Sequence, residues 1–132
     1  MSFLVDTDIC SAYLRGEPAL FNRFLQFAGN LHVSAIVVGE LFTWAFRQAA
    51  PAKRIYAIES FLDDVRILDY DRQIATRFGQ LHAHLLDNGK PKGFADLSIA
   101  ATALTHDLTL VTHNTADYVD VPDLRLEDWL AN

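Results

Sequence analysis

Four acidic residues lie directly after strand-like segments of the sequence or early in the helices expected to follow them: Asp6, Glu40, Asp96 and Asp117. Carboxylates that meet at one point repel each other and raise one another's pKa. A divalent cation removes that conflict, and oxygen donors suit Mg²⁺, with Mn²⁺ as the second candidate. Such an ion binds a phosphate oxygen and lowers the pKa of a water molecule. The expected chemistry is therefore phosphodiester hydrolysis, with metal-activated water rather than a side chain as the nucleophile.

Each acid also has a purely structural interpretation when it is taken singly. Asp6 can cap a helix or occupy a turn, Asp96 can complement a helix N-terminus, and Asp117 can lie in a surface turn. Glu40 lies in the apolar segment Val37–Phe42. A glutamate in such surroundings costs desolvation unless it is paired or liganded, so we expect Glu40 to be little exposed. The metal-site interpretation depends on the joint pattern across separate segments.

Short apolar strands that alternate with helices are expected to position these acids. The strands are predicted at 3–5, 31–33, 65–68 and 108–112, with a fifth at 124–126. The helices are predicted at about 8–14, 18–27, 35–45, 51–62, 72–86 and 94–107, with Ser34 and Asp71 as caps. This alternation indicates an α/β fold with a short, mostly parallel central sheet flanked by helices. The carboxyl ends of parallel strands meet at one edge, where sites form.

Composition limits the remaining possibilities. A chain of 132 residues predicts a single domain over 1–132, and one cysteine, Cys10, excludes an internal disulfide and is expected in the core. The net charge of −6 argues against tight, charge-driven nucleic-acid binding, but it does not exclude an enzyme that touches a few phosphates through cations. No apolar stretch approaches the ~20 residues of a membrane span, and no signal peptide is evident, so we expect a cytoplasmic protein without a membrane contact.

Four stretches of the sequence together resemble the PIN-domain ribonucleases, and specifically the VapC toxins of type II toxin–antitoxin systems. LVDTDI resembles the first motif of that family, with Asp6 as its first acid. VSAIVVGELF resembles the segment with the second acid, Glu40, and KPKGFADLSIAATAL resembles the segment with the third, Asp96. LVTHNTADYVDVPDLRLEDWL resembles the closing stretch of the family. The resemblance covers almost the whole chain.

This resemblance implies a PIN-like domain with Mg²⁺-dependent endoribonuclease activity, often on tRNA. It also implies a homodimer and neutralisation by a cognate VapB-type antitoxin, with operator DNA bound only through the antitoxin. Some residues are candidates for these contacts, although core positions or a solvated helix face explain them equally well. The candidates are Phe42, Trp44, Phe46 and Tyr56 for a partner helix, and Arg47, Lys53 and Arg54 for RNA phosphates.

The chain departs from the family pattern at two positions. Asp8 stands where relatives commonly have asparagine, so it either adds a metal ligand or only caps a helix. Relatives carry their fourth acid where either Asn114 or Asp117 stands. We favour Asp117, with Asn114 as a neutral oxygen donor. Thr7 and Thr112 are expected to hydrogen-bond to metal-bound water or to the backbone, with helix capping as the stronger interpretation of Thr7.

Two other functions are compatible with parts of the sequence. Asp6-Thr7-Asp8 resembles the Asp-x-Asp of haloacid-dehalogenase-type phosphotransfer enzymes, in which Asp6 would be a covalent nucleophile and Asp8 an acid/base. However, Ile9-Cys10 replaces the Gly-Thr expected there, and the chain is short. A catalytically silent PIN module that keeps only a partner surface is the second alternative. The intact acids argue against it, and a thermal shift induced by Mg²⁺ or Mn²⁺ would exclude it.

Overall fold

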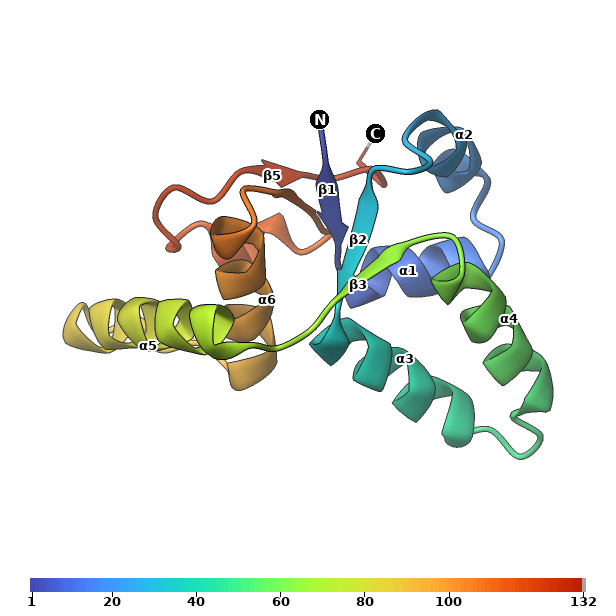
Figure 1. Ribbon diagram of the computed structural model, residues 1–132, viewed down its shortest axis with the longest axis horizontal. Coiled ribbons are helices and arrows are strands. Elements are labelled where there is room, and N and C mark those ends of the chain that lie inside the picture. The colour runs from blue at the N-terminus through green and yellow to red at the C-terminus, as the bar shows by residue number, and fades with distance from the viewer. Residues whose placement is uncertain (132) are drawn as a thin grey trace.

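The computed structural model describes residues 1–131 and contains one five-stranded sheet in which all pairings are parallel (Figure 1). The strand order is β3-β2-β1-β4-β5. The strands are β1 (Phe3–Val5), β2 (Leu31–Ser34), β3 (Arg66–Leu68), β4 (Thr109–Val111) and β5 (Leu126–Glu127). The predicted α/β fold with a parallel central sheet is confirmed.

Six α-helices flank the sheet and connect its strands. They are α1 (Thr7–Leu14), α2 (Pro18–Gln26), α3 (Ala35–Phe46), α4 (Ala52–Leu62), α5 (Arg72–Asp87) and α6 (Phe94–Thr105), followed by a short 3₁₀ helix, η1 (Thr115–Tyr118). In Figure 1, α5 and α6 lie to the left of the strands and α1, α3 and α4 to the right. The carboxyl ends of β1 and β2 point to the region where α1 and α3 begin.

Most predicted boundaries agree with the structure within one or two residues, and the expected caps explain why. The Ser34 and Asp71 side chains accept hydrogen bonds from Ile36 N and Ile74 N, and so begin α3 and α5. Asp6 caps α1, which agrees with its structural interpretation, and the expectation that Thr7 or Asp8 is the cap was wrong. The predicted strand at 124–126 was wrong in detail, because β5 comes later.

The core lies between the central strands and the helices that cover them. All residues of β1 and β4 are buried, as is the run of small residues in α6 from Leu97 to Ala103. The first turn of α6 lies near the end of β1, where the Tyr118 hydroxyl bonds to both Asp96 and Asp6. Leu25, an apolar residue of α2, is 77% exposed. None of the helices in residues 1–131 is long and apolar enough to cross a membrane.

Candidate active site

Asp6 is the residue at which β1 ends and α1 begins. Its Oδ1 accepts a hydrogen bond from Thr7 N at 2.8 Å, and its Oδ2 accepts bonds from Thr112 Oγ1 at 2.9 Å and the Tyr118 hydroxyl at 3.1 Å. The residue is only 6% exposed. Burial, and then the charge of Asp8, raise the pKa of Asp6 from 3.8 to about 6, although the three hydrogen bonds oppose the rise. A cation beside this carboxylate would remove the unfavourable charge.

The Tyr118 hydroxyl connects Asp6 with Asp96, the predicted third acid. It lies 3.1 Å from Asp6 Oδ2 and 3.3 Å from Asp96 Oδ1, so the two carboxylates share one donor. Burial and the two carboxylates raise the pKa of Tyr118 above its ordinary value, which keeps the hydroxyl protonated as a donor. Sequence reasoning missed this residue. The available signal was a hydroxyl-bearing aromatic immediately after a candidate acid, but aromatics are usually core residues.

Glu40 joins this group through Thr7 rather than directly. Thr7 Oγ1 donates a hydrogen bond to Glu40 Oε1 at 2.6 Å, which links the first turn of α1 to the second turn of α3. The expectation that Glu40 is little exposed was wrong, because its side chain lies at the exposed surface of α3. Val37 and Leu41 enter the core, whereas Glu40 lies at the exposed edge of the helix face that they form.

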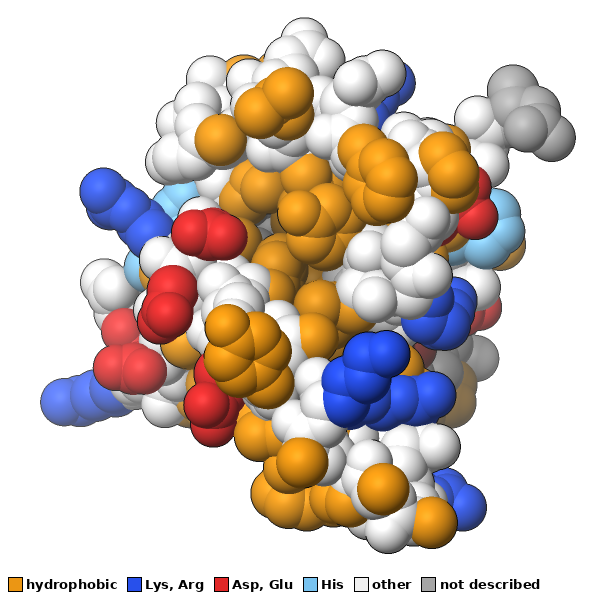
Figure 2. All heavy atoms as spheres, turned by 90° about the vertical axis from the view of Figure 1, so that its right-hand side faces the viewer, with side chains coloured by type: hydrophobic (Ala, Val, Ile, Leu, Met, Phe, Trp, Pro, Cys, Tyr) orange, Lys and Arg blue, Asp and Glu red, His pale blue; other side chains and the backbone are white. Residues whose placement is uncertain are grey.

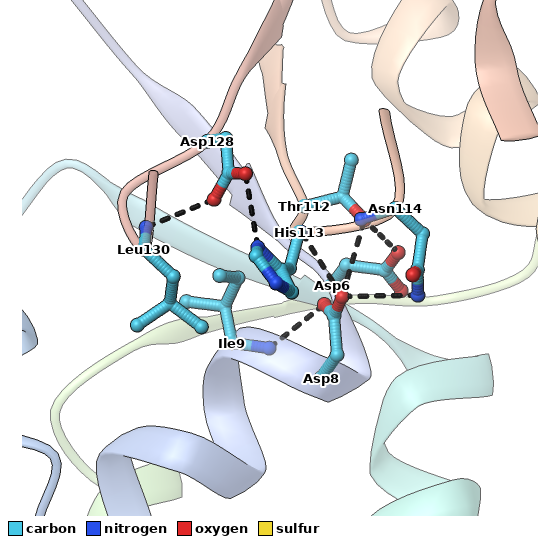
Figure 3. Close-up of polar contacts among 8 residues, drawn as sticks. All are labelled: Asp6, Asp8, Ile9, Thr112, His113, Asn114, Asp128 and Leu130. Carbon is cyan, nitrogen blue, oxygen red and sulfur yellow. Dashed lines mark hydrogen bonds and ion pairs between the residues drawn. The ribbon is translucent and has the colours of Figure 1, made fainter. Parts of the chain in front are cut away.

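Asp8 fixes the loop after β4 against the start of α1 (Figure 3). Its Oδ2 accepts hydrogen bonds from His113 N at 2.9 Å and Asn114 Nδ2 at 3.2 Å, with Thr112 Oγ1 at 3.5 Å. Its Oδ1 accepts a bond from Ile9 N at 2.8 Å. Both oxygens therefore serve local structure. This arrangement favours the structural interpretation of Asp8 over that of a free ligand.

The two candidates for the fourth acidic position, Asn114 and Asp117, have different surroundings in the structure. Asn114 lies at the site, where its amide binds Asp8 and its backbone N donates to Thr112 Oγ1 at 3.1 Å. Asp117 is exposed on η1, and within residues 1–131 its carboxylate accepts no hydrogen bond from any residue of the site. Its assignment as the fourth acid stays a prediction.

Two other polar side chains near Asp6 have different environments. His113 is exposed, and its Nδ1 lies 2.9 Å from Asp128 Oδ2 in the C-terminal segment (Figure 3). Cys10 is fully buried behind the end of β1. Burial raises the pKa of its thiol well above 9, so it is a core side chain as predicted and not a nucleophile.

The donor set fits a hard divalent cation in its chemistry. Asp6 and Asp96 are held together by one hydroxyl, and further oxygen donors come from Glu40, Asn114 and the threonines. Carboxylate, amide and hydroxyl oxygens suit Mg²⁺ or Mn²⁺ rather than Zn²⁺. As the side chains of residues 1–131 lie, no three His, Cys, Asp or Glu residues are close enough to hold one ion. A third carboxylate ligand would have to turn inward, or water would complete the shell.

Comparison with known proteins places the chain in a family. The family model of the PIN domain matches residues 3–123. The chain is 35% identical over 130 residues to the tRNA(fMet)-specific endonuclease VapC of Shigella flexneri, covering 98% of each chain. It is 37% identical over 131 residues to the ribonuclease VapC2 of Haemophilus influenzae, covering 98% of this chain and 99% of the relative.

Solved structures agree with the sequence comparison. The DNA-bound VapBC complex of Salmonella typhimurium superposes with a TM-score of 0.93 at 32% identity, over 98% of each chain. VapBC2 of Rickettsia felis, bound to a promoter DNA fragment, superposes with a TM-score of 0.90 at 28% identity, over 98% of this chain and 99% of the other. These matches also exclude the haloacid-dehalogenase alternative. The chain therefore belongs to the PIN-domain family, as a ribonuclease toxin of the VapC type.

Proposed function

We propose that the protein is a Mg²⁺-dependent endoribonuclease that hydrolyses a phosphodiester bond in tRNA and is inhibited by a VapB-type antitoxin. The observation that carries the metal requirement is the Asp6–Tyr118–Asp96 arrangement, in which a buried carboxylate with a raised pKa shares a hydroxyl donor with a second carboxylate. Mn²⁺ is the second candidate ion. Two like charges so close are expected at a site that binds a cation during function.

Each residue of the site has a role in this proposal. Asp6 and Asp96 would hold the ion, and Glu40, oriented by Thr7, would supply the next carboxylate. Asp117 is our candidate for the fourth acid, with Asn114 as a neutral oxygen donor. When bound, the ion would stabilise charge on the phosphate and lower the pKa of the attacking water. Thr112 and Tyr118 hold the Asp6 carboxylate in place through its Oδ2.

The substrate and partners are inferred from the relatives. Because the Shigella flexneri relative is a tRNA(fMet)-specific endonuclease, we propose tRNA as the substrate and tRNA(fMet) as the first RNA to test. Solved relatives occur as VapBC complexes on DNA. We infer that a VapB-type antitoxin binds this chain and carries the contact with operator DNA, since the net charge of −6 disfavours direct binding of the toxin to duplex DNA. A homodimer is the expected assembly.

Cleavage of purified tRNA with and without Mg²⁺ tests the proposal. We expect cleavage by the wild-type protein in Mg²⁺, loss of cleavage in a chelator, and loss of cleavage in Asp6→Asn and Asp96→Asn. Asp64→Asn is the matched control, because it removes one exposed carboxylate elsewhere on the surface. Wild-type cleavage rates in both site variants would reject the assignment. Mapping the ends of cellular RNA after a short pulse of expression would identify the substrate.

A further inference from the structure

Two hollows that share Trp44 lie beside the acidic site, the first along α3 and the second between α1 and α4. The first, of about 630 Å³, is lined by Thr7, Glu40, Thr43, Trp44, Arg47 and Gln48. The second, of about 570 Å³, is lined by Leu14, Arg15, Trp44, Lys53, Arg54 and Ala57. Trp44 lines both hollows, so we call them together the Trp44 channel. Because Thr7 and Glu40 belong to the site, the channel begins where the scissile phosphate would lie.

The channel is cationic although the protein as a whole is acidic. Between Thr43 and Ile58 the sequence contains Arg47, Lys53 and Arg54 and no acidic residue, while the whole chain has a net charge of −6. In the part of the chain that the structure describes, none of these three cations forms an ion pair. Unpaired cations gathered beside an acidic site are complementary to a polyanion that is delivered to that site.

The Arg54 guanidinium stacks on the Trp44 indole, with 4.2 Å between the guanidinium carbon and the ring centroid. Flat surfaces of this kind accept an unstacked RNA base, because aromatic rings and guanidinium planes both stack on bases. Arg47 follows Glu40 by seven residues, or about 10 Å along the helix. Contacts in the channel would therefore fall close to the cleaved bond and not at a remote part of the RNA.

Neither of two other hollows has this combination of features. One is lined by Tyr13, Phe21, Phe24, Leu25 and Phe61 among others and is mainly apolar. Figure 2 shows such hydrophobic side chains around a hollow, with Lys and Arg side chains gathered beside it. The other contains Arg72 and Arg77 but no aromatic residue, and Thr105 lines it at the end of α6 opposite Asp96.

We propose that the Trp44 channel binds an unpaired RNA segment directly beside the scissile phosphate. Phosphates contact Arg47 and Lys53, and one splayed base stacks on the Arg54–Trp44 pair. The inference rests on the proposed ribonuclease function and adds to it the residues that hold the nucleotides beside the cut. A fully paired duplex cannot stack a base on the Arg54–Trp44 pair, because its bases are stacked within the helix.

Binding measurements in the Asp96→Asn background test the channel separately from cleavage. The probes are a fluorescent RNA hairpin with an unpaired loop and a duplex in which the loop sequence is fully paired. We expect the hairpin to bind more tightly, and Arg47→Ala/Arg54→Ala to weaken its binding. The slope of log K against log[salt] should become smaller in magnitude by about 0.7 for that variant, because it loses one phosphate contact, that of Arg47. Arg72→Ala/Arg77→Ala removes the same charge from the other cationic hollow and should leave hairpin binding unchanged.

Tryptophan fluorescence reports the stacking contact. Trp129 is 4% exposed, so RNA-induced quenching should come from half-buried Trp44 and disappear in Trp44→Phe. Loss of the stacked base in Trp44→Ala should weaken hairpin binding by about 5- to 150-fold. If Trp44→Ala does not fold, as judged by circular dichroism, Arg54→Lys serves instead, because it keeps the charge and removes the planar surface.

The possible failures are distinguishable. Equal affinity of the hairpin and the duplex, or unchanged hairpin binding by Arg47→Ala/Arg54→Ala, would overturn the inference and leave the proposed nuclease intact. If that variant still binds RNA but no longer binds an acidic peptide such as polyglutamate, the channel binds an acidic protein segment instead of RNA, and the inference is overturned. Cleavage by Asp6→Asn and Asp96→Asn at the wild-type rate would reject the nuclease site itself, whatever the channel binds.

Discussion

Replacing Asp6 with asparagine should stabilise the metal-free protein at neutral pH, although it removes a site residue. The pKa of Asp6 is about 6 in the folded protein and 3.8 ordinarily. Ionisation of Asp6 is therefore less favourable in the folded chain than in the unfolded chain. The destabilisation caused by the Asp6 charge is absent below about pH 4, grows between about pH 4 and 6, and reaches its full size above about pH 6. Stability should fall as the pH rises through this window.

The size of this effect follows from the pKa difference. At 1.36 kcal/mol for each pKa unit, the shift corresponds to at most about 3 kcal/mol at neutral pH. An asparagine amide in place of Oδ2 can donate to the Thr112 and Tyr118 hydroxyls, but it loses the charge-assisted bonds that they now make. We therefore expect a net gain of about 1–3 kcal/mol, or about 4–12 °C in Tm for a chain of this length.

Thermal unfolding in a chelator, at about pH 7.5 and again at about pH 4, measures the effect. We expect Asp6→Asn to unfold at a higher temperature than the wild type at the higher pH and at the same temperature at the lower pH. Addition of Mg²⁺ should then raise the Tm of the wild type but not that of the variant. If Asp6→Asn is less stable than the wild type at neutral pH while Asp64→Asn is unchanged, the hydrogen bonds of Asp6 outweigh its desolvation, and the reasoning is refuted.

Three other substitutions have distinct expected outcomes. Tyr118→Phe removes the donor shared by Asp6 and Asp96. In the presence of a chelator it should destabilise the protein by about 1.5–3 kcal/mol at neutral pH, measured by thermal unfolding, and it should weaken Mn²⁺ binding, measured by calorimetry. An unchanged Tm and Mn²⁺ affinity would contradict this role. Asp8→Asn removes the second cause of the raised Asp6 pKa, so carboxylate NMR should show that pKa closer to 3.8, and no change would mean that burial alone sets it. Glu40→Gln keeps an acceptor for Thr7 at an exposed position, so the free energy of unfolding should change by less than about 0.5 kcal/mol. The rate of tRNA cleavage should nevertheless fall by about 100-fold or more. A comparable loss of cleavage in Asp64→Asn would show that the effect is not local.

The sequence predicted the framework of the site because short-range signals determine it. The apolar run Phe3–Val5 stops at a carboxylate, which identified both β1 and the position of Asp6. The Ser34 cap and the small residues of α6 likewise placed α3 and the helix that carries Asp96. These features depend on hydrophobic periodicity and capping, and neither requires knowledge of distant contacts.

The details of the site depend on contacts that periodicity does not encode. Tyr118 meets Asp6 across 112 positions of sequence, and Asp8 binds a loop more than 100 positions away. Glu40 was expected to be buried because its neighbours are apolar, but it lies at the exposed edge of the helix face that enters the core. The late position of β5 has a similar cause, since its two residues are assigned by their pairing with β4 rather than by their own composition.

Calorimetric titration of Mn²⁺ into the wild-type protein and into Asp96→Asn tests most directly whether the acids converge on one cation. We expect saturable binding by the wild type at about neutral pH and binding at least about tenfold weaker in the variant, because one of its ligands has lost its charge. Asp64→Asn should bind as the wild type does. Equal Mn²⁺ affinity in the wild type and Asp96→Asn, or no binding to either, would contradict the metal site on which the proposed function depends.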